Sequence, residues 1–283
     1  MTAEPAAAAS ARTAGETPLP SAWRIGLART GIELRSFFRE KQAVAFVFSL
    51  PAVLLVLLGS IFRGQAAGHG FSVGELFAAG LIGGGIMSTS FQYLGISIAT
   101  ERDQGLLKRL RGTPMPGAAY FIGKTGLVLI STVAETVILI FVGMLVDHLQ
   151  LPASAARWWT FAWVFVLGTV ACTLLGIAAS SVPRSARSAT AVITFPFVVL
   201  QFISGVYVPF TLVPNWLRDA GAIFPLKWIC QGLRSVFLPA QAATLEPAGS
   251  WEHGRTALVL AAWIVAGLAL CLTTFRWQRR RDG

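Results

Sequence analysis

Charged, cysteine and histidine residues are scarce in this chain. Only 13% of its 283 residues are charged, and it has three cysteines and three histidines. Cys172, Cys230 and Cys271 lie far apart, so their spacing implies neither a disulfide framework nor a metal site. The histidines are scattered over separate loops. We therefore expect this chain to bind no metal.

Motifs for catalysis are missing as well. The sequence has no HExxH, no GxSxG and no spaced carboxylate pair in a polar context. Residues 117–125 end in Gly-Lys-Thr like a phosphate-binding loop, but five residues separate the glycines where four are required. This segment opens an apolar run, so we interpret Lys124 as a lysine whose charge reaches the membrane surface. We expect no cofactor to be bound by this chain.

Apolar residues dominate the rest of the chain. They make up 54% of it, and the mean hydropathy of +0.65 is too high for a soluble globule. Six apolar runs approach the ~20 residues needed to cross a bilayer. They cover residues 43–62, 75–99, 120–146, 158–180, 189–208 and 255–275. We predict an all-α polytopic membrane protein with six transmembrane helices, preceded by a disordered tail at residues 1–20.

An amphipathic helix is predicted over residues 21–41, directly before the first span. One side of its helical wheel carries arginines and the other is apolar. The apolar side consists of Trp23, Leu27, Thr30, Leu34, Phe37 and Phe38. This pattern is typical of a helix in the membrane interface. A solvent-facing helix packed on the rest of the protein is the alternative, but aromatic residues just before a span favour the interface.

The loop between the second and third spans, residues 100–118, concentrates charge. If residues 101–111 are one helix, Leu106, Leu107 and Leu110 make a narrow apolar stripe, and the prolines that follow end the helix. The charged residues are Glu101, Arg102, Asp103, Lys108, Arg109 and Arg111. The loop either presents a face to a partner in the water or is an ordinary positively charged connection. The residues alone do not decide between these two interpretations.

Lysine and arginine residues predict the orientation. With the N-terminus in the cytoplasm, 17 of these 23 residues lie on the inner side and 6 on the outer side, as the positive-inside rule requires. Both termini and the loop at 100–118 are then cytoplasmic. The distribution along the spans explains the net charge of +10, so the charge does not indicate nucleic-acid binding.

Three polar residues within the spans are candidates for a transport pathway. Glu135 lies near the middle of the third span, where a carboxylate is costly unless it is paired or protonated. It could face a substrate path or couple protons. We favour the alternative, a protonated glutamic acid that hydrogen-bonds Ser131, Thr132 or a neighbouring helix, because no lysine or arginine within the spans can pair with it. Gln92 and Gln201 could line a pathway or equally join helices.

Glycine and proline mark two further features. Gly80 and Gly84 have the GxxxG spacing that allows close helix approach, either between chains or within one chain. Pro196 is expected to kink the fifth span.

Residues 209–250 are too long for a turn and too broken for a span, which predicts two short half-helices at the outer leaflet, re-entrant or interfacial. Their marker residues are Pro209, Pro214, Trp216, Pro225 and Trp228.

In this order the segments resemble the ABC-2 type permeases, the membrane subunits of type V ABC exporters, and among them the daunorubicin/doxorubicin-resistance permeases. The resemblance covers residues 21–278. It rests on ERDQGLLKRLRGTPMP at 101–116 and on Ser204-Gly205 followed by the prolines and Trp216 of the outer segment.

The resemblance implies roles for these segments. Residues 21–41 would be the connecting helix, residues 101–111 the coupling helix that docks on a separate ATPase subunit, and residues 209–250 the outer re-entrant structure. Two permease chains, identical or different, would work with two ATPase chains that bind ATP and Mg. Family substrates include drugs, lipids, glycolipids and polysaccharides.

We therefore predict a permease subunit, not itself an enzyme, in a bacterial plasma membrane. It would belong to an ATP-driven exporter that moves a hydrophobic or amphiphilic substrate out of the cytoplasm or inner leaflet, with membrane lipids as further partners. A secondary transporter that couples protons through Glu135 is one alternative, but it would show internal repeats. A membrane-embedded lipid-modifying enzyme is another, but it would need a His, Asp or Glu cluster at one membrane face.

Overall fold

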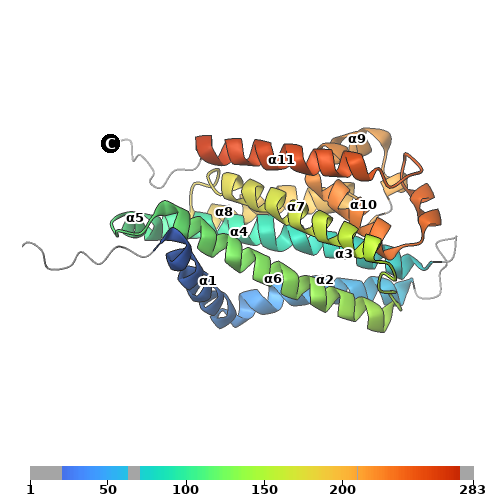
Figure 1. The fold of residues 1–283 in the computed structure, drawn as a ribbon, viewed down its shortest axis with the longest axis horizontal. Coiled ribbons are helices and arrows are strands. Elements are labelled where there is room, and N and C mark those ends of the chain that lie inside the picture. The colour runs from blue at the N-terminus through green and yellow to red at the C-terminus, as the bar shows by residue number, and fades with distance from the viewer. Residues whose placement is uncertain (1–20, 63–70, 209, 275–283) are drawn as a thin grey trace, which may run out of the picture.

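A computed structural model describes residues 21–62, 71–208 and 210–274 of the protein. All regular elements of this described part are helices, which confirms the predicted all-α class (Figure 1). The predicted tail at residues 1–20 lies outside it, as do Pro209 and the residues after 274.

Five helices are each long and apolar enough to cross a membrane. They lie at the first and at the third to sixth predicted spans, with ends that differ by up to five residues. They are α2 (Lys41–Ile61), α6 (Gly117–Val146), α7 (Ala155–Ala179), α8 (Ala186–Ile203) and α11 (His253–Thr274). α8 runs through Pro196 as a single helix.

The second predicted span is present as three consecutive helical pieces. α3 (Val73–Met87) passes into the π-helix η2 (Ser88–Tyr93), which passes into α4 (Leu94–Asp103). A π-helical turn carries an extra residue and is frequent at functional sites. Because each piece alone is shorter than a span, the count of six spans stays a prediction.

α3 is the central helix of the bundle. Residues 76–87 are all buried, and α2, α6, α7 and α10 pack around them. A Cβ atom at Gly80 would lie 2.9 Å from the carbonyl oxygen of Val206, and one at Gly84 would lie 2.7 Å from Oε1 of Gln201. The GxxxG spacing of these glycines therefore serves close packing within this chain.

α1 (Ala22–Arg39) packs along α6, and only part of its predicted apolar side stays open. The buried stripe consists of Gly26, Thr30, Glu33 and Phe37. Thr30 and Phe37 therefore face the bundle, and their predicted place on the membrane-facing side is wrong. The open side keeps Trp23, Leu27 and Phe38 exposed and Leu34 half-buried. That α1 lies in the membrane interface stays a prediction.

The chain between α8 and α11 forms short helices. These are η3 (Phe210–Leu212), α9 (Asn215–Ile223), α10 (Pro225–Phe237) and η4 (Ala240–Leu245). Pro214 precedes α9 and Pro225 opens α10, where a missing N–H costs no helical hydrogen bond. Trp216 on α9 is exposed, whereas Trp228 on α10 is buried and its indole N–H donates to the Ala222 carbonyl at 2.7 Å.

α10 is buried along its whole length, and it packs against α3, α7 and α11 inside the bundle. α9 keeps an open face, where Trp216 is exposed. The burial of α10 fits the re-entrant alternative for this segment and not the interfacial one. That these helices lie at the outer leaflet stays a prediction.

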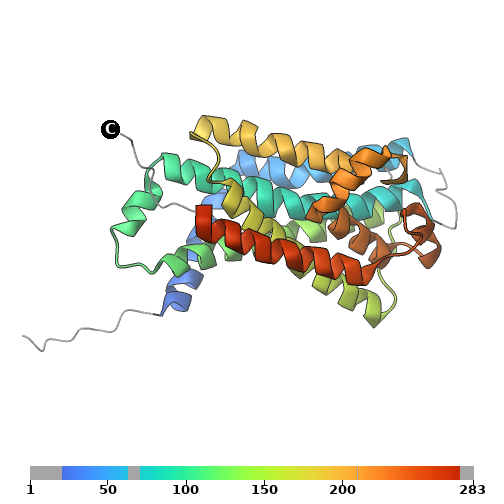
Figure 2. The ribbon, with the colours of Figure 1, turned by 90° about the horizontal axis from the view of Figure 1, so that it is seen from above.

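The helices form one elongated bundle (Figure 1). α5 (Leu106–Arg111) lies at one end, where the described chain also begins and ends, and α9 lies near the opposite end. Figure 2 shows α8 and α2 along one edge of the bundle and α11 on the other side. The six predicted spans would likewise place both chain ends on one side of the membrane, because an even number of crossings returns the chain to the side where it began.

Gly176 of α7 provides a test of the packing around η2. A Cβ atom there would lie 2.7 Å from the carbonyl oxygen of Ser90 and 2.9 Å from that of Phe91, and main-chain atoms cannot rotate away. We expect Gly176→Ala to lower the free energy of unfolding by about 1–3 kcal/mol. The measurement is the melting temperature of the purified protein in detergent.

Gly31→Ala is the matched control within α1. A Cβ atom at Gly31 meets none of the described atoms within 4 Å, and alanine should stabilise a helix by roughly 0.5–1 kcal/mol relative to glycine. Equal melting temperatures for the two variants would contradict the close contact between α7 and η2.

Candidate coupling surface and membrane cavity

The charged loop at 101–111 is two helices, so the prediction of one helix is wrong. α4 ends at Asp103, Gln104 closes its last turn, and Gly105 has a φ of 74°. This left-handed conformation is readily adopted by glycine and turns the chain before α5 begins at Leu106. As a result Glu101, Arg102 and Asp103 belong to α4, and Lys108, Arg109 and Arg111 belong to α5.

α5 has one face on the bundle and one face open. Leu107 is buried and Leu110 partly buried, and both pack with Leu94, Ile98 and Tyr120. The open face consists of Leu106, Lys108, Arg109 and Arg111. We call these four residues the coupling surface. Three of them are basic, so this end of the molecule offers a positively charged patch around one exposed leucine.

Arg102 and Asp103 hold the neighbouring loop. The guanidinium of Arg102 donates to the carbonyl of Pro183 at 3.2 Å. Asp103 accepts a hydrogen bond from the main-chain N–H of Ala186 at 2.9 Å, at the first turn of α8, where a carboxylate stabilises the helix. These two residues therefore connect α4 to the α7–α8 loop. Both are among the charged residues of the loop that the resemblance assigned to the coupling helix.

A buried group of charges lies beneath the coupling surface. We call it the Lys124 cluster; it consists of Arg29, Glu33, Glu101, Tyr120 and Lys124. The Lys124 ammonium lies 2.8 Å from Glu33 and is also paired with Glu101. Tyr120 donates to Glu101 at 2.9 Å, and Arg29 pairs with Glu33 at 2.9 Å.

This cluster corrects the interpretation of Lys124. Its side chain is only 1% exposed, so its charge does not reach the membrane surface. Burial is tolerated because Glu33 of α1 and Glu101 of α4 approach it from two helices, and buried charges require such partners. The two cations and two anions sum to zero. The cluster therefore links α1, α4 and α6 next to α5.

A cavity of about 470 Å³ lies between α2, α8 and the α3–η2–α4 segment. We call it the α2–α8 cavity. Apolar side chains line most of it, and no charged residue is among them. Gln92 and Gln201, two of the predicted pathway residues, both line it. Gln92 donates to the hydroxyl of Thr194 at 2.9 Å, and Gln201 donates to the carbonyl of Gly84 at 3.4 Å. Both amides therefore join helices and also face the cavity.

Glu135 does not line this cavity. It lies on α6 against the other side of η2, where the hydroxyl of Thr89 donates to its Oε2 at 2.6 Å. Its predicted partners Ser131 and Thr132 are buried, and their hydroxyls find no hydrogen-bond partner among the described residues. The contact to a neighbouring helix agrees with the alternative we favoured. η2 is thus held by α6 through Thr89 and by α8 through Gln92.

A second buried group of charges lies towards the other end of the bundle. Arg234 of α10 pairs with Glu246 at 2.8 Å and also donates to the carbonyl of Gly205. Lys227 lies 4.0 Å from Glu246 and contacts Gln231. Burial lowers the pKa of Lys227 below its ordinary value, and Glu246 acts against this effect. These contacts anchor α10 to η4 and to the turn after α8.

The arrangement is that of a polytopic membrane protein: a helical bundle with a cavity between its helices and a basic face at one end. A model of the ABC-2 type transporter family matches residues 28–238. The chain therefore belongs to the ABC-2 type transporter family, as the resemblance implied, and is a multi-pass membrane subunit of an ABC transporter.

Two relatives of this chain are also named as transport permeases. The inner membrane transport permease YadH of Escherichia coli (strain K12) is 25% identical over 231 residues, which cover 78% of this chain and 84% of YadH. The "Probable multidrug ABC transporter permease YbhR" of the same organism is 26% identical over 143 residues, which cover 50% of this chain and 38% of YbhR.

Sequence reasoning missed Glu33, Tyr120 and the true place of Lys124. A signal was available in the charge pattern. Glu33 is the one acidic residue of α1, and Lys124 is the one basic residue of α6. A lone acid in a basic helix and a lone lysine in an apolar helix are complementary, and pairing them would have predicted that α1 packs on α6.

Lys124→Met tests the cluster. It would leave Glu33 and Glu101 buried without their shared cation, so we expect the free energy of unfolding to fall by about 3–5 kcal/mol. The measurement is thermal unfolding in detergent. The double variant Lys124→Met, Glu101→Gln keeps the pair of Arg29 and Glu33, leaves no unpaired charge and should recover most of the loss. A single variant as stable as the unmodified protein would show that Lys124 is not the cation that the two carboxylates need.

Proposed function

We propose that this chain is the permease subunit of an ATP-driven exporter and that a separate ATPase subunit docks on the coupling surface. One observation carries the proposal. The helix that leads to the coupling surface, α4, continues without a break through η2 into the wall of the α2–α8 cavity. A push on α5 would therefore reach the cavity along a single segment of chain.

The transmission would be mechanical. Leu107 and Leu110 pack on Leu94 and Ile98, so movement of α5 would carry α4 with it. The Lys124 cluster would make α1 and α6 follow, because separating its ions would expose buried charges. Packed helices move as rigid bodies between discrete arrangements, and the π-helical turn η2 is the place where α4 could shift relative to α3.

The partner's chemistry follows from the charge of the coupling surface. Lys108, Arg109 and Arg111 would make charge-assisted hydrogen bonds with carboxylates of the ATPase, and Leu106 would fill an apolar hollow beside them. The partner would bind ATP and Mg. The working unit would hold two permease chains, identical or different, and two ATPase chains.

The cavity supports a hydrophobic or amphiphilic substrate without a full charge. Its lining is apolar, with amide and hydroxyl groups from Gln92, Gln201 and Thr194 and no charged side chain. Such a lining would hold an uncharged drug or lipid-like molecule and orient it by a few hydrogen bonds. The relative YbhR is named a probable multidrug ABC transporter permease, which supports the same class.

We place the coupling surface and both chain ends in the cytoplasm. The described chain begins and ends at the α5 end of the bundle (Figure 1), and most lysines and arginines of the sequence fall on that side. Export from the cytoplasm or inner leaflet of a bacterial plasma membrane is then the direction of transport.

Double charge reversal on α5 tests the docking proposal. Lys108→Glu with Arg109→Glu would set like charges against the acidic partner, at a cost of several kcal/mol. We expect transport to fall by about tenfold or more and the ATPase to co-purify less well. The measurement is substrate efflux from cells that express the permease with its co-purifying ATPase, at matched membrane levels.

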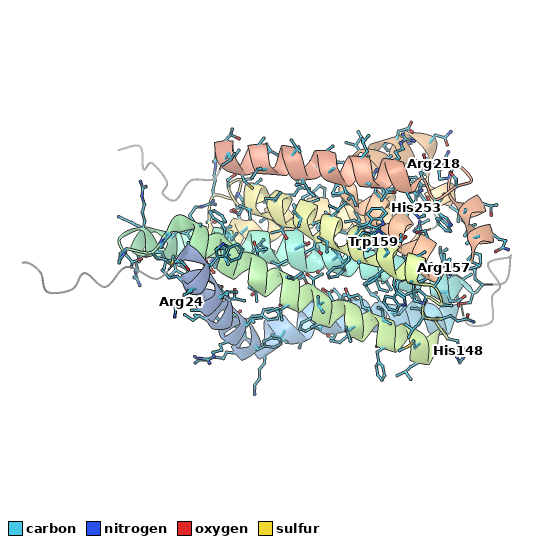
Figure 3. All side chains as sticks on the ribbon, viewed as in Figure 1. Arg24, His148, Arg157, Trp159, Arg218 and His253 are labelled. Carbon is cyan, nitrogen blue, oxygen red and sulfur yellow. The ribbon has the colours of Figure 1, made fainter. Side chains whose placement is uncertain are left out.

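Arg157→Glu with Arg218→Glu is the control. Both arginines lie at the opposite end of the bundle (Figure 3), so this variant carries the same change of charge away from the coupling surface. Normal transport by the α5 variant with an intact complex would overturn the docking proposal.

Two adjacent valines of α8 test the cavity. Val198 lines it and Val199 does not, although their exposed fractions are similar, 42% and 40%. Val198→Trp should fill part of the cavity and lower transport by about tenfold, with basal ATP hydrolysis retained. Val199→Trp should transport normally. Equal effects of the two variants on substrate-stimulated ATP hydrolysis would exclude this cavity as the substrate site.

A further inference from the structure

The side chain of Gln201 is buried with its amide oxygen unpaired. It is only 4% exposed, and its Oε1 finds no hydrogen-bond donor among the described residues. Its Nε2 donates to the carbonyl of Gly84 at 3.4 Å, beyond the usual limit of about 3.2 Å. The amide is therefore held by one long hydrogen bond, and its oxygen is left without a donor.

A second buried glutamine, Gln231 of α10, shows what a structural amide looks like in this protein. Its Oε1 accepts from the ammonium of Lys227, and its Nε2 donates to the carbonyl of Ser250 at 3.3 Å. Both ends of this amide are thus paired. An acceptor that is buried without a donor destabilises a folded protein. Packing alone therefore does not explain the glutamine at position 201.

The unpaired oxygen lies beside the α2–α8 cavity. Gln201 and Gly84 both line this cavity, and a Cβ atom at Gly84 would lie 2.7 Å from Oε1. The last torsion of a glutamine side chain is broad, and the hydrogen bond of Nε2 is long. Rotation of the amide group therefore turns the oxygen to the cavity without movement of a helix. A bound molecule that carries a donor can then pair with it.

The lining of the cavity has an apolar part and a polar part. α2 contributes only apolar residues, from Phe46 to Leu54. All polar residues of the lining come from the α3–η2–α4 segment, from α8 and from the turn after α8. Of the two amides among them, Gln92 is already bonded to Thr194. The cavity thus suits a molecule with one apolar edge and one edge that forms hydrogen bonds, and the oxygen of Gln201 is the acceptor still open to it.

The place of Gln201 along the cavity gives the bound molecule a direction. Thr190 and Gln201 are the first and last residues of α8 in the lining, about 17 Å apart at the helical rise of ~1.5 Å per residue. α8 begins beside α4, where Asp103 accepts from the N–H of Ala186. Gln201 therefore lies at the end of the cavity away from α5. A molecule that pairs with it has its donor at that end.

We propose that the amide oxygen of Gln201 accepts a hydrogen bond from a hydroxyl or an amide N–H of the transported molecule. Gln201 thereby selects, among uncharged amphiphiles, those that carry a donor at the end of the cavity away from α5. This inference rests on the proposed function of the α2–α8 cavity as the substrate site. It adds which group of the substrate is recognised and which residue recognises it.

Paired probes test the recognition. The first pair is 1-pyrenebutanol and its methyl ether, and the second is the N-methyl and N,N-dimethyl amides of 1-pyrenebutanoic acid, so each pair differs in one donor. Saturable binding of the tritiated probes to the full-length permease in nanodiscs is measured by scintillation proximity. We expect the unmodified permease to bind each donor probe about tenfold more tightly than its methylated analogue. Gln201→Met should bind both members of a pair equally.

Gln231→Met is the matched control, because it makes the same change at a buried glutamine outside the cavity. It should keep the tenfold preference but lower the melting temperature, since Lys227 loses its acceptor. Gln201→Met removes an unpaired acceptor, so its melting temperature should equal or exceed that of the unmodified protein. A preference retained by Gln201→Met would show that water and not the substrate satisfies the oxygen, and would overturn the inference. A fall in melting temperature as large as that of Gln231→Met would also overturn it.

Val198→Trp separates failure of this inference from failure of the proposed function. If this cavity-filling variant still binds both members of a pair, the cavity is not the binding site and both proposals fail. If it binds neither member while Gln201→Met retains the preference, only the role of Gln201 fails. Absence of saturable binding of both donor probes to the unmodified permease would contradict both proposals.

Discussion

The structure depends on one constraint: charged groups within a membrane protein must find their partners inside the protein. The Lys124 cluster meets it with two cations, two anions and a tyrosine from three helices. Burying a pair of charges costs desolvation energy, and a well-formed ion pair only just offsets this cost. Such a pair therefore adds little to the free energy of folding, and its main effect is to select the helix packing in which the two charges meet. Here it fixes α1 and α4 against α6. The same logic holds α10 in the core, where Arg234 and Glu246 pair.

The helical segment from α3 to α5 is fixed at its α5 end and changes helical form in its middle. Its α5 end is tied by Glu101, Arg102 and Asp103 to α6 and to the α7–α8 loop. Its middle is the π-helix η2, which bonds to α6 and α8 through Thr89 to Glu135 and Gln92 to Thr194 and packs closely on Gly176 of α7. Because η2 also lines the α2–α8 cavity, the proposed displacement of α4 would act on the wall of this cavity.

Much of the fold could be predicted from the sequence because apolar runs of span length have one stable form in a bilayer, the helix. The five long helices followed from such runs, and Gln92 and Gln201, two polar residues within these runs, line one cavity. Their role in a transport pathway stays a prediction. The break at Gly105 was missed because charge density says nothing about backbone direction. Lys124 was misplaced because its partners, Glu33 and Glu101, are distant in sequence. The sequence left open whether α10 is re-entrant or interfacial, because Lys227 and Arg234 find their buried partner in Glu246, which follows η4.

Two hollows that differ in their polar groups lie on different sides of the bundle. The α2–α8 cavity keeps amides and hydroxyls that can form and release hydrogen bonds, as Gln92 does with Thr194. The hollow between α6, α7 and α11 is mostly apolar; Thr173 donates to the carbonyl of Thr169, whose own hydroxyl has no partner among the described residues. The α2–α8 cavity, in contrast, adjoins η2, so the displacement proposed for that segment would change the shape of its wall.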